Sequence, residues 1–396
     1  MNYSDLFTAH FPTIINAVQD LLVSTDYKIT PNIIQQTRSR FPQFNHELIS
    51  KILDIALSTH RAQTITKYAS IMPWYFTEQT LMQSSEPAFA NHVINRLDCR
   101  NHRFLEICTG SGMHAFSAIM NGASQVITHE LDDFVASLAK MNYMLHGQEI
   151  NPLCIDGSEA EITSTDIFWA DPSRRKSGIE RKTLTGIYSP NLHQLIDMAG
   201  QAKRGGIKIA PGERIEGEFT REFLGFGREC REQILWFNMD VIDGTVTLID
   251  KQKTFIPDAK GKLPQLVDMK SSQTYTYLLE PHSALIRGDL TSMYLENDIA
   301  VIDRSIAYGM SNRMHDADWF AHFSILHREK YSRRRLQECI NELKWNRLTE
   351  IKKRGFPIEP DTLRKQIKFA ENSEYHGVII LTRHENDHLM FFCERT

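Results

Sequence analysis

Between residues 102 and 237, short apolar and β-branched runs alternate with helical segments, and this pattern constrains the fold more than any other feature. Strand patterns occupy residues 104–107, 125–129, 151–155, 167–170, 206–209 and 233–237, and helical patterns occupy 114–120, 133–145 and 191–202. Such alternation is typical of a parallel α/β sheet. A doubly wound sheet binds its ligand at the carboxyl ends of its strands, so we expect the chemistry in the loops after Ile107, His129 and Ala170.

The segments on either side of this region have different patterns. In residues 1–98, apolar side chains recur at three- and four-residue spacing, as in Ile49, Ile52, Leu53 and Ala56, which indicates a helical region. We expect the α/β domain over residues 99–240. Residues 241–396 are rich in strand patterns, then helical and basic. They end in two strand patterns, 378–382 and 389–393, which predict a hairpin on a small α+β domain.

The composition limits the class of protein. With 396 residues, 41% of them hydrophobic, the chain is long enough for more than one core. Its 45 basic and 49 acidic residues nearly balance, which excludes a uniformly cationic surface but leaves local basic patches open. The six cysteines are scattered without a Cys-x-x-Cys pair, which favours a reducing compartment. Because neither a secretory signal nor an apolar run of about 20 residues is present, we expect a soluble, cytoplasmic protein with no membrane contact.

A glycine turn follows the first strand pattern of the α/β region. Residues 104–108 lead into Thr109-Gly110-Ser111-Gly112, and glycines there let the backbone approach a ligand at the start of a helix. A dinucleotide-binding loop would have a third glycine where this chain has His114-Ala115. Glu106, ahead of the glycines, suits a cationic amino group better than a pyrophosphate. We therefore predict an S-adenosylmethionine site that includes Glu106, Cys108, Thr109, Gly110 and Gly112.

Three further residues are candidates for this cofactor site. Glu130 ends the second strand pattern, eighteen residues beyond Gly112, where a carboxylate can accept hydrogen bonds from both ribose hydroxyls. Asp156 follows the 151–155 run and is a candidate for the adenine amino group; a turn or helix-cap role before Gly157 is an equal alternative. Ser84, together with its neighbours Ser85 and Glu86, is a candidate for closing over the methionine end, although Ser84-Ser85-Glu86-Pro87 is also an ordinary helix start with serine capping, and capping ranks slightly ahead.

These features resemble class I S-adenosylmethionine-dependent methyltransferases, and within them bacterial proteins with a helical amino-terminal region and a carboxy-terminal THUMP-like domain. The motifs that carry the resemblance cover most of the chain: Gln83-Ser-Ser-Glu86, the 105–112 loop, Asp171-Pro-Ser-Arg-Arg175, Lys208-Ile-Ala-Pro211, Arg228-Glu-Cys-Arg-Glu232, Glu280-Pro-His-Ser-Ala284 and Arg354-Gly-Phe-Pro357. The glycine loop is shared by a whole superfamily, whereas the Asp-Pro-x-Arg-Arg and Arg-Gly-Phe-Pro segments are narrower. Ser173 and Arg287, where relatives more often have alanine and lysine, are mild departures. The resemblance implies a Rossmann-like class I methyltransferase sheet with a helical amino-terminal cap and a small α+β carboxy-terminal domain.

The loop after the strand pattern 167–170 is the candidate acceptor side, because the resemblance implies that it lies beside the methyl group. Asp171 could accept a hydrogen bond from an amine or hydroxyl acceptor, and Pro172 fixes the backbone. Arg174 and Arg175 offer planar forks for a phosphate or carboxylate of the substrate. The alternative is that Asp171 pairs with one of these arginines to hold the loop. Lys208 is either a substrate contact or a solvated strand end.

Two other kinds of chemistry are not indicated. We expect no metal site, because His384 and His388, the one pair with His-x-x-x-His spacing, flank a predicted hairpin turn. Cys230 precedes an apolar strand pattern, so we interpret it as structural and not as the nucleophile of a pyrimidine C5 mechanism.

Three functions are compatible with this pattern. Residues 328–368 contain thirteen Lys or Arg against six Asp or Glu, so an RNA methyltransferase that binds phosphates through this basic region is the leading hypothesis. Within that region, Arg333–Arg335 alternate with Glu329 and Glu338 at helical spacing, which a solvated helix face also explains. A small metabolite or a protein as the methyl acceptor is the second hypothesis. A non-catalytic module that binds the cofactor is the third.

Overall fold

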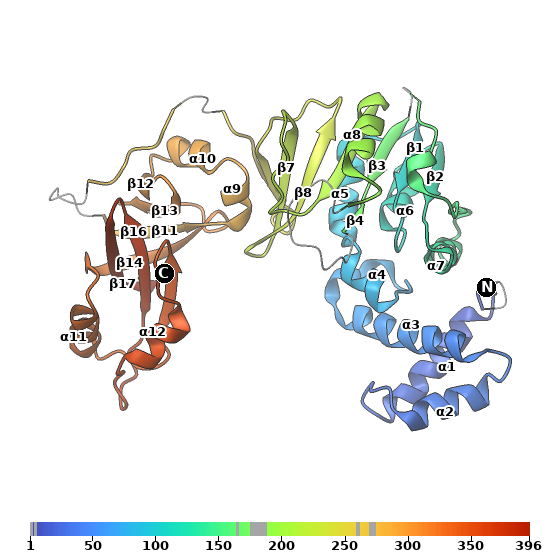
Figure 1. The fold of residues 1–396 in the computed structure, drawn as a ribbon, viewed down its shortest axis with the longest axis horizontal. Coiled ribbons are helices and arrows are strands. Elements are labelled where there is room, and N and C mark those ends of the chain that lie inside the picture. Colours follow the sequence, from blue (N-terminus) through green and yellow to red (C-terminus); the bar gives the residue numbers. More distant parts are fainter. Residues whose placement is uncertain (1–2, 4–5, 164–165, 175–187, 259–261, 269–274) are drawn as a thin grey trace. The chain divides into compact units, whose positions relative to one another are not determined.

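The computed structural model describes residues 3, 6–163, 166–174, 188–258, 262–268 and 275–396 (Figure 1). The chain divides into two compact units. The first consists of Met1–Thr220 and Ile234–Val241, and the second of Arg221–Gln233 and Ile242–Thr396. The three-part division predicted at 1–98, 99–240 and 241–396 stays a prediction. None of the described helices is long and apolar enough to span a bilayer.

The amino-terminal part of the first unit is helical, as the spacing of its apolar residues predicts. Its elements are α1 (Phe11–Val23), α2 (Pro31–Arg40), α3 (His46–Thr64), η1 (Thr66–Ile71), α4 (Glu78–Gln83) and α5 (Pro87–Leu97). Thr30 and Asn45 cap α2 and α3 by accepting backbone N–H bonds, and a proline lies in the first turn of α1, α2 and α5. The buried face of α3 packs with α1 and with the helix that begins at Asp133 in one apolar cluster.

The α/β part of the first unit follows the predicted alternation closely. Its elements are β1 (Arg103–Ile107), α6 (Met113–Met120), β2 (Gln125–His129), α7 (Asp133–Leu145), η2 (Gly157–Glu159), β3 (Ile167–Ala170), β4 (Ser173–Arg174), β5 (Tyr188–Ser189), α8 (Leu192–Gln201) and β6 (Arg204–Ile209). The predicted strand at 151–155 is wrong. That run forms only a single bridge between Leu153 and His129, because Pro152 has no amide to donate and the side chains of Leu153 and Ile155 stay exposed.

The strand order positions the carboxyl ends of the central strands together. The eight-stranded sheet has the order β10-β9-β7-β8-β6-β3-β1-β2, in which β1 pairs in parallel with both β2 and β3, and β3 pairs in parallel with β6. Leu105 and Ile107 belong to a core shared by β1, β3, β6 and α8. Glu106, between them, points to the opposite face because side chains alternate along a strand. The predicted fold class, a Rossmann-like sheet with a helical cap, is confirmed.

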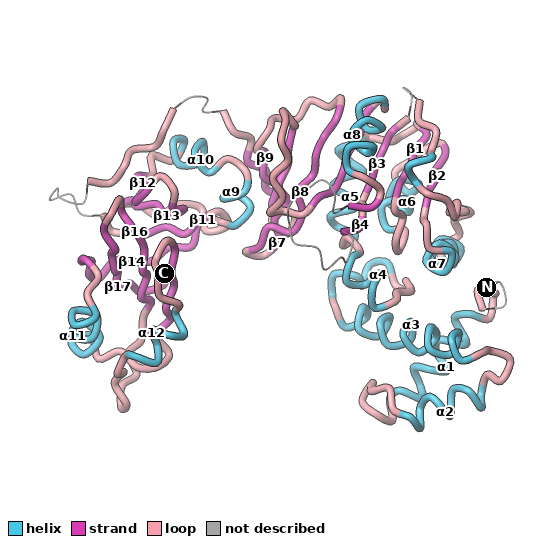
Figure 2. Tube along the Cα trace, in the orientation of Figure 1, coloured by secondary structure: helices cyan, strands magenta, loops and turns pink. Residues whose placement is uncertain are grey.

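The second unit is built mainly of strands (Figure 2). Its elements are β7 (Thr220–Phe226), β8 (Glu229–Phe237), β9 (Thr245–Leu248), β10 (Lys253–Phe255), β11 (Tyr277–Pro281), α9 (Ser283–Arg287), α10 (Leu290–Glu296), β12 (Ala300–Asp303), β13 (Ile306–Ser311), β14 (Phe320–Lys330), α11 (Arg333–Leu343), β15 (Glu350–Arg354), α12 (Pro360–Gln366), β16 (Val378–His384) and β17 (Asp387–Arg395), of which the first two begin or end at the border with the first unit. Seven of these strands form a sheet of order β12-β13-β11-β14-β17-β16-β15. The predicted closing hairpin is β16 and β17, which pair antiparallel.

Candidate cofactor and acceptor site

The glycine turn after β1 has the backbone conformation that glycine favours. Gly110 and Gly112 have φ of 56° and 91°, and Cys108 has φ of 63°. The turn is held to the end of β2, since the amides of Cys108 and Thr109 both donate to the carbonyl of His129, at 2.9 and 3.1 Å. A left-handed residue costs little for glycine and more for residues with a Cβ, so this geometry explains why glycines stand here.

The two glycines differ in the space around them. A Cβ on Gly112 would collide with the ring and hydroxyl of Tyr143 from α7, whereas a Cβ on Gly110 would have no atom within 4 Å. Gly112 therefore serves the packing of α6 against α7. The open side of Gly110 leaves room for a ligand beside the backbone.

Glu106 is a buried carboxyl group without a well-formed hydrogen bond in the described part of the chain. The residue is fully buried, and neither of its oxygens has a described partner of good geometry, although the Thr109 side chain and the Ala115 backbone lie close enough to lower its pKa in part. Burial raises the pKa of this carboxyl group well above its ordinary value. His114 Nδ1 lies 3.8 Å from Glu106 Oε1, but burial holds the pKa of this imidazole well below its usual range, so it brings no positive charge. Ionisation of Glu106 would therefore be favoured by a cation bound beside it.

Glu130 lies directly beside the glycine turn. Its Oε2 accepts a hydrogen bond from the amide of Gly110 at 2.9 Å, and its Oε1 accepts one from the amide of Asp132 at 3.1 Å. Each oxygen keeps a second lone pair, so the carboxylate can still accept from two hydroxyl groups. The structure thus brings Glu106, Gly110, Gly112 and Glu130 to one end of β1 and β2, as the sequence predicts.

Ser84 reaches the glycine turn from the helical region. Its hydroxyl lies 2.7 Å from the hydroxyl of Ser111, and the carbonyl of Ser111 accepts hydrogen bonds from the indole of Trp74 and the amide of Asn142. The helix-capping alternative is wrong, because the N-cap of α5 is Glu86 and no side chain caps that end. The sequence did not point to Ser111 as a partner, since its contact with Ser84 joins residues far apart in the chain.

Asp156 makes the turn contact that was its alternative interpretation. Its carboxylate accepts from the backbone amide of Ser158 at 2.9 Å and from the hydroxyl of the same residue at 2.8 Å. An adenine contact by Asp156 stays a prediction. Cys108 is half-buried, and its thiol donates to the carbonyl of Ser189 at 3.7 Å. Burial raises the pKa of this thiol, and a cofactor contact by Cys108 stays a prediction.

The candidate acceptor loop begins at the end of β3. Asp171 Oδ2 accepts a hydrogen bond from Lys208 Nζ at 2.7 Å, and the amide of Asp171 donates to the carbonyl of Ile107. Pro172 is buried, and the backbone of Arg174 lies in β4, which pairs with β5. The side chain of Arg174 and all of Arg175 lie outside the described residues. The described ionic partner of Asp171 is Lys208, which the sequence suggested only as one of two alternatives.

Two groups that the sequence set aside lie in the second unit. The thiol of Cys230 has its pKa raised to about 12 by burial, which fits the structural interpretation. His384 Nε2 hydrogen-bonds to the carbonyl of Val267 at 3.0 Å, while the ring of His388 packs edge-on against Phe356. These two histidines face different neighbours.

Six of the thirteen cations of the basic region form ion pairs with described residues, namely Lys330, Arg334, Arg335, Lys352, Lys353 and Arg354. Arg334 bonds to Glu338 at 2.7 Å, Lys352 to Glu280 at 2.7 Å, and Lys353 to Glu359 at 2.6 Å. Glu329 is in β14 and not on the helix that carries the arginines, so the predicted helical spacing with Glu329 is wrong. A cavity of about 560 Å³ between α11 and α12 is lined by the cations Arg333, Arg334 and Lys368, among others.

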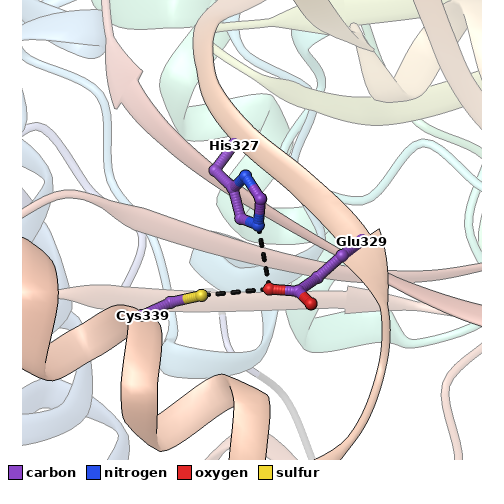
Figure 3. A group of neighbouring side chains, drawn as sticks. All are labelled: His327, Glu329 and Cys339. Carbon is purple, nitrogen blue, oxygen red and sulfur yellow. Dashed lines mark hydrogen bonds and ion pairs between the residues drawn. The ribbon is translucent and has the colours of Figure 1, made fainter.

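Glu329 forms a clamp between β14 and α11 (Figure 3). Its Oε1 lies 2.8 Å from His327 Nε2 and accepts from the thiol of Cys339 at 3.1 Å. The ligand-type atoms of these three residues lie within 4.8 Å of one another. The guanidinium of Arg335 already donates to both oxygens of Glu329, at 2.9 and 3.2 Å. Because this guanidinium occupies the position where a metal ion would bind Glu329, we interpret the cluster as a structural clamp.

Comparisons with known proteins agree with this architecture. Residues 321–395 match the family described as THUMP domain-like. A crystal structure named as a "putative methyltransferase" from Porphyromonas gingivalis matches with a TM-score of 0.73 at 17% identity, over 97% of this chain and 98% of that chain. No curated protein matches the sequence.

Two other solved structures match over a smaller part of the chain. A tRNA methyltransferase from Aquifex aeolicus has a TM-score of 0.30 at 13% identity, over 43% of this chain and 74% of that chain. An S-adenosylmethionine-dependent O-methyltransferase from Thermotoga maritima has a TM-score of 0.26 at 16% identity, over 39% of this chain and 65% of that chain. On the full-length match and the family match together, the chain has the class I methyltransferase fold and carries a THUMP-like domain at residues 321–395.

Proposed function

We propose that this protein is an S-adenosylmethionine-dependent methyltransferase. The observation that carries the proposal is Glu106, a fully buried carboxyl group beside a glycine turn, with no well-formed hydrogen bond to a described residue. The amino group of S-adenosylmethionine is a cation that would favour the ionised form of this group. Glu130 would hold the ribose hydroxyls, and the open side of Gly110 would admit the ligand. These residues fit the cofactor, and NAD, with its anionic pyrophosphate, fits them poorly.

When bound, the cofactor supplies an electrophilic methyl group on a sulfonium, whose carbon–sulfur bond breaks as the acceptor's lone pair forms the new bond. The protein's part is to align donor and acceptor, because this displacement needs little acid–base catalysis. Asp171 lies at the carboxyl end of β3 and can accept a hydrogen bond from an N–H or O–H of the acceptor. That contact would turn the acceptor's lone pair in the required direction and receive the proton that the acceptor loses.

RNA is the acceptor that the molecule supports best. The THUMP-like match at 321–395 is the main support, and the cavity with Arg333, Arg334 and Lys368 offers cations for phosphate groups. Pairing of the neighbouring cations with glutamates reduces the free charge, so we expect a modest number of phosphate contacts. All six cysteines are free thiols, which supports the cytoplasmic location predicted from the sequence.

The test is calorimetric titration of the full-length protein with S-adenosylmethionine and with NAD, repeated on Glu130→Ala. Glu149→Ala, which removes an exposed glutamate of the same unit, is the matched control. We expect micromolar binding of S-adenosylmethionine and none of NAD. Loss of hydrogen bonds to a charged group costs about 1.5–3 kcal/mol, so Glu130→Ala should weaken binding on the order of 10- to 100-fold. Absence of binding to the methyl donor would sink the enzyme proposal.

The acceptor is then tested with cofactor carrying a labelled methyl group, total cellular RNA and pools of small metabolites. Labelled RNA, with binding that weakens steeply as salt rises, supports RNA as the substrate. Label in metabolites or proteins alone shifts the function to those acceptors. Cofactor binding without label in any pool favours a non-catalytic module.

A further inference from the structure

Lys208 is an unusually enclosed lysine in the candidate site. It lies near the end of β6, next to β3 in the sheet, and its side chain is only 17% exposed. Its Nζ donates to Asp171 Oδ2 at 2.7 Å and to the hydroxyl of Ser85 at 3.0 Å. Lysines are seldom buried without a specific partner, so these two contacts explain why a cation is retained here.

Ser85 connects this ion pair to the glycine turn. The neighbouring residue Ser84 lies with its hydroxyl 2.7 Å from the hydroxyl of Ser111, inside the turn. Two adjacent serines therefore contact the two halves of the site, one on the cofactor side and one on the acceptor side. A displacement of residues 84–85 would move both contacts together.

Asp171 is held by one oxygen and left open at the other. Lys208 binds Oδ2, and in the described part of the chain no hydrogen bond reaches Oδ1. A carboxylate fixed in this way has one oriented oxygen for an acceptor group. Without Lys208, the side chain of Asp171, which is 21% exposed, could turn toward solvent.

We propose that Lys208, itself held by the hydroxyl of Ser85, is a positioning residue that fixes the carboxylate of Asp171. This inference rests on the proposed methyltransferase function. A positioning role for this ion pair differs from a purely structural role in one respect. A structural pair would change stability alone, whereas a positioning pair changes the rate of methyl transfer at unchanged cofactor affinity.

The kinetic test uses Lys208→Met, Lys208→Arg and the matched control Lys203→Met, which removes an exposed lysine just ahead of β6. Misplacement of a catalytic group by about 1 Å can cost on the order of 100-fold in rate, so we expect Lys208→Met to lower kcat about 10- to 100-fold. KM for S-adenosylmethionine should change less than about twofold. Lys208→Arg should recover part of kcat, and the control should match the wild type. An unchanged kcat in Lys208→Met would overturn the proposal.

A double-mutant cycle separates action through Asp171 from an independent effect. If Lys208 acts through this carboxylate, Lys208→Met combined with Asp171→Ala should be no slower than Asp171→Ala alone, within about twofold. Losses that multiply would show that Lys208 acts by another route. Thermal melting of each variant checks folding. If Lys208→Met unfolds, the single variants Lys208→Arg and Ser85→Ala are measured in its place.

A crystal structure of Lys208→Met gives a readout that does not depend on activity. A displaced Asp171 carboxylate supports the proposal even if the wild type methylates neither RNA nor metabolites, a result that would count against the proposed function alone. An Asp171 side chain in its original position overturns the positioning role.

Discussion

Replacing Glu106 with glutamine should change the pH dependence of stability in a defined direction. The folded-state pKa of Glu106 is raised by burial, so the folded protein keeps a proton that the unfolded chain loses near pH 4.3. A raised pKa means stability that is fully present below the unfolded value and is lost as the pH rises toward the folded value. Over that window, the wild type should lose about 1.4 kcal/mol per pH unit from this group. Glutamine does not titrate and should lose none.

This difference is large enough to measure by thermal unfolding of the cofactor-free protein. For a domain of 150–250 residues, 1 kcal/mol corresponds to about 2–4 °C, so the Tm of Glu106→Gln should gain about 3–6 °C on the wild type for each pH unit between about 5 and the raised pKa of the folded state. Asp20→Asn, which neutralises an exposed carboxylate of α1, serves as the control and should track the wild type. Parallel curves of Tm against pH for wild type and Glu106→Gln would refute the reasoning.

The same substitution should weaken cofactor binding although it stabilises the cofactor-free protein at higher pH. Loss of a charge-assisted contact should lower the affinity for S-adenosylmethionine on the order of 10- to 100-fold. Because binding of a cation favours the ionised carboxylate, the wild type should release a proton on binding, and Glu106→Gln should not. Titration in two buffers of different ionisation enthalpy counts that proton. Equal proton release by the two proteins would show that Glu106 does not meet the cation.

Three other substitutions test the surroundings of the site and the tail clamp. Gly112→Ala should cost about 2–5 kcal/mol, since left-handed strain adds to a clash with α7, whereas Gly110→Ala should cost only about 1–2 kcal/mol; equal melting temperatures would contradict this. Asp166→Asn should cost about 3–5 kcal/mol in urea unfolding at pH 7, because it leaves the partly buried Arg103 guanidinium without its carboxylate. Burial alone raises the pKa of Asp166, but the hydrogen bonds from Arg103 hold this pKa below its ordinary value. The difference in unfolding free energy between the wild type and Asp166→Asn should therefore shrink as the pH falls below about 4. A difference that stays constant with pH would exclude this ion pair as its cause. Glu329→Gln should lose about 1–3 kcal/mol locally and speed hydrogen exchange in residues 333–343, and unchanged exchange would show that the clamp is dispensable.

The elements of the α/β region could be predicted from the sequence because their signals are local. An apolar run that is buried on both faces, such as Ile167–Ala170, specifies a strand wherever it lies in the chain. The predicted strand at 151–155 was wrong because Pro152 has no amide to donate to a neighbouring strand and the apolar Leu153 and Ile155 stay exposed. β14 was missed because half of its eleven residues are polar, and only pairing with β11 and β17 makes it a strand.

The candidate site divides in a similar way. By itself, the sequence determined the glycine turn, the acids Glu106 and Glu130, and the loop at Asp171, because motif spacing along a βαβ unit fixes which end of the sheet these residues occupy. Only the tertiary structure decided that Glu106 is buried without a well-formed hydrogen bond to a described residue, that Lys208 pairs with Asp171, and that Ser84 meets Ser111. These contacts connect residues that lie tens of positions apart in the sequence. They depend on side-chain packing and burial, which spacing along a chain does not encode.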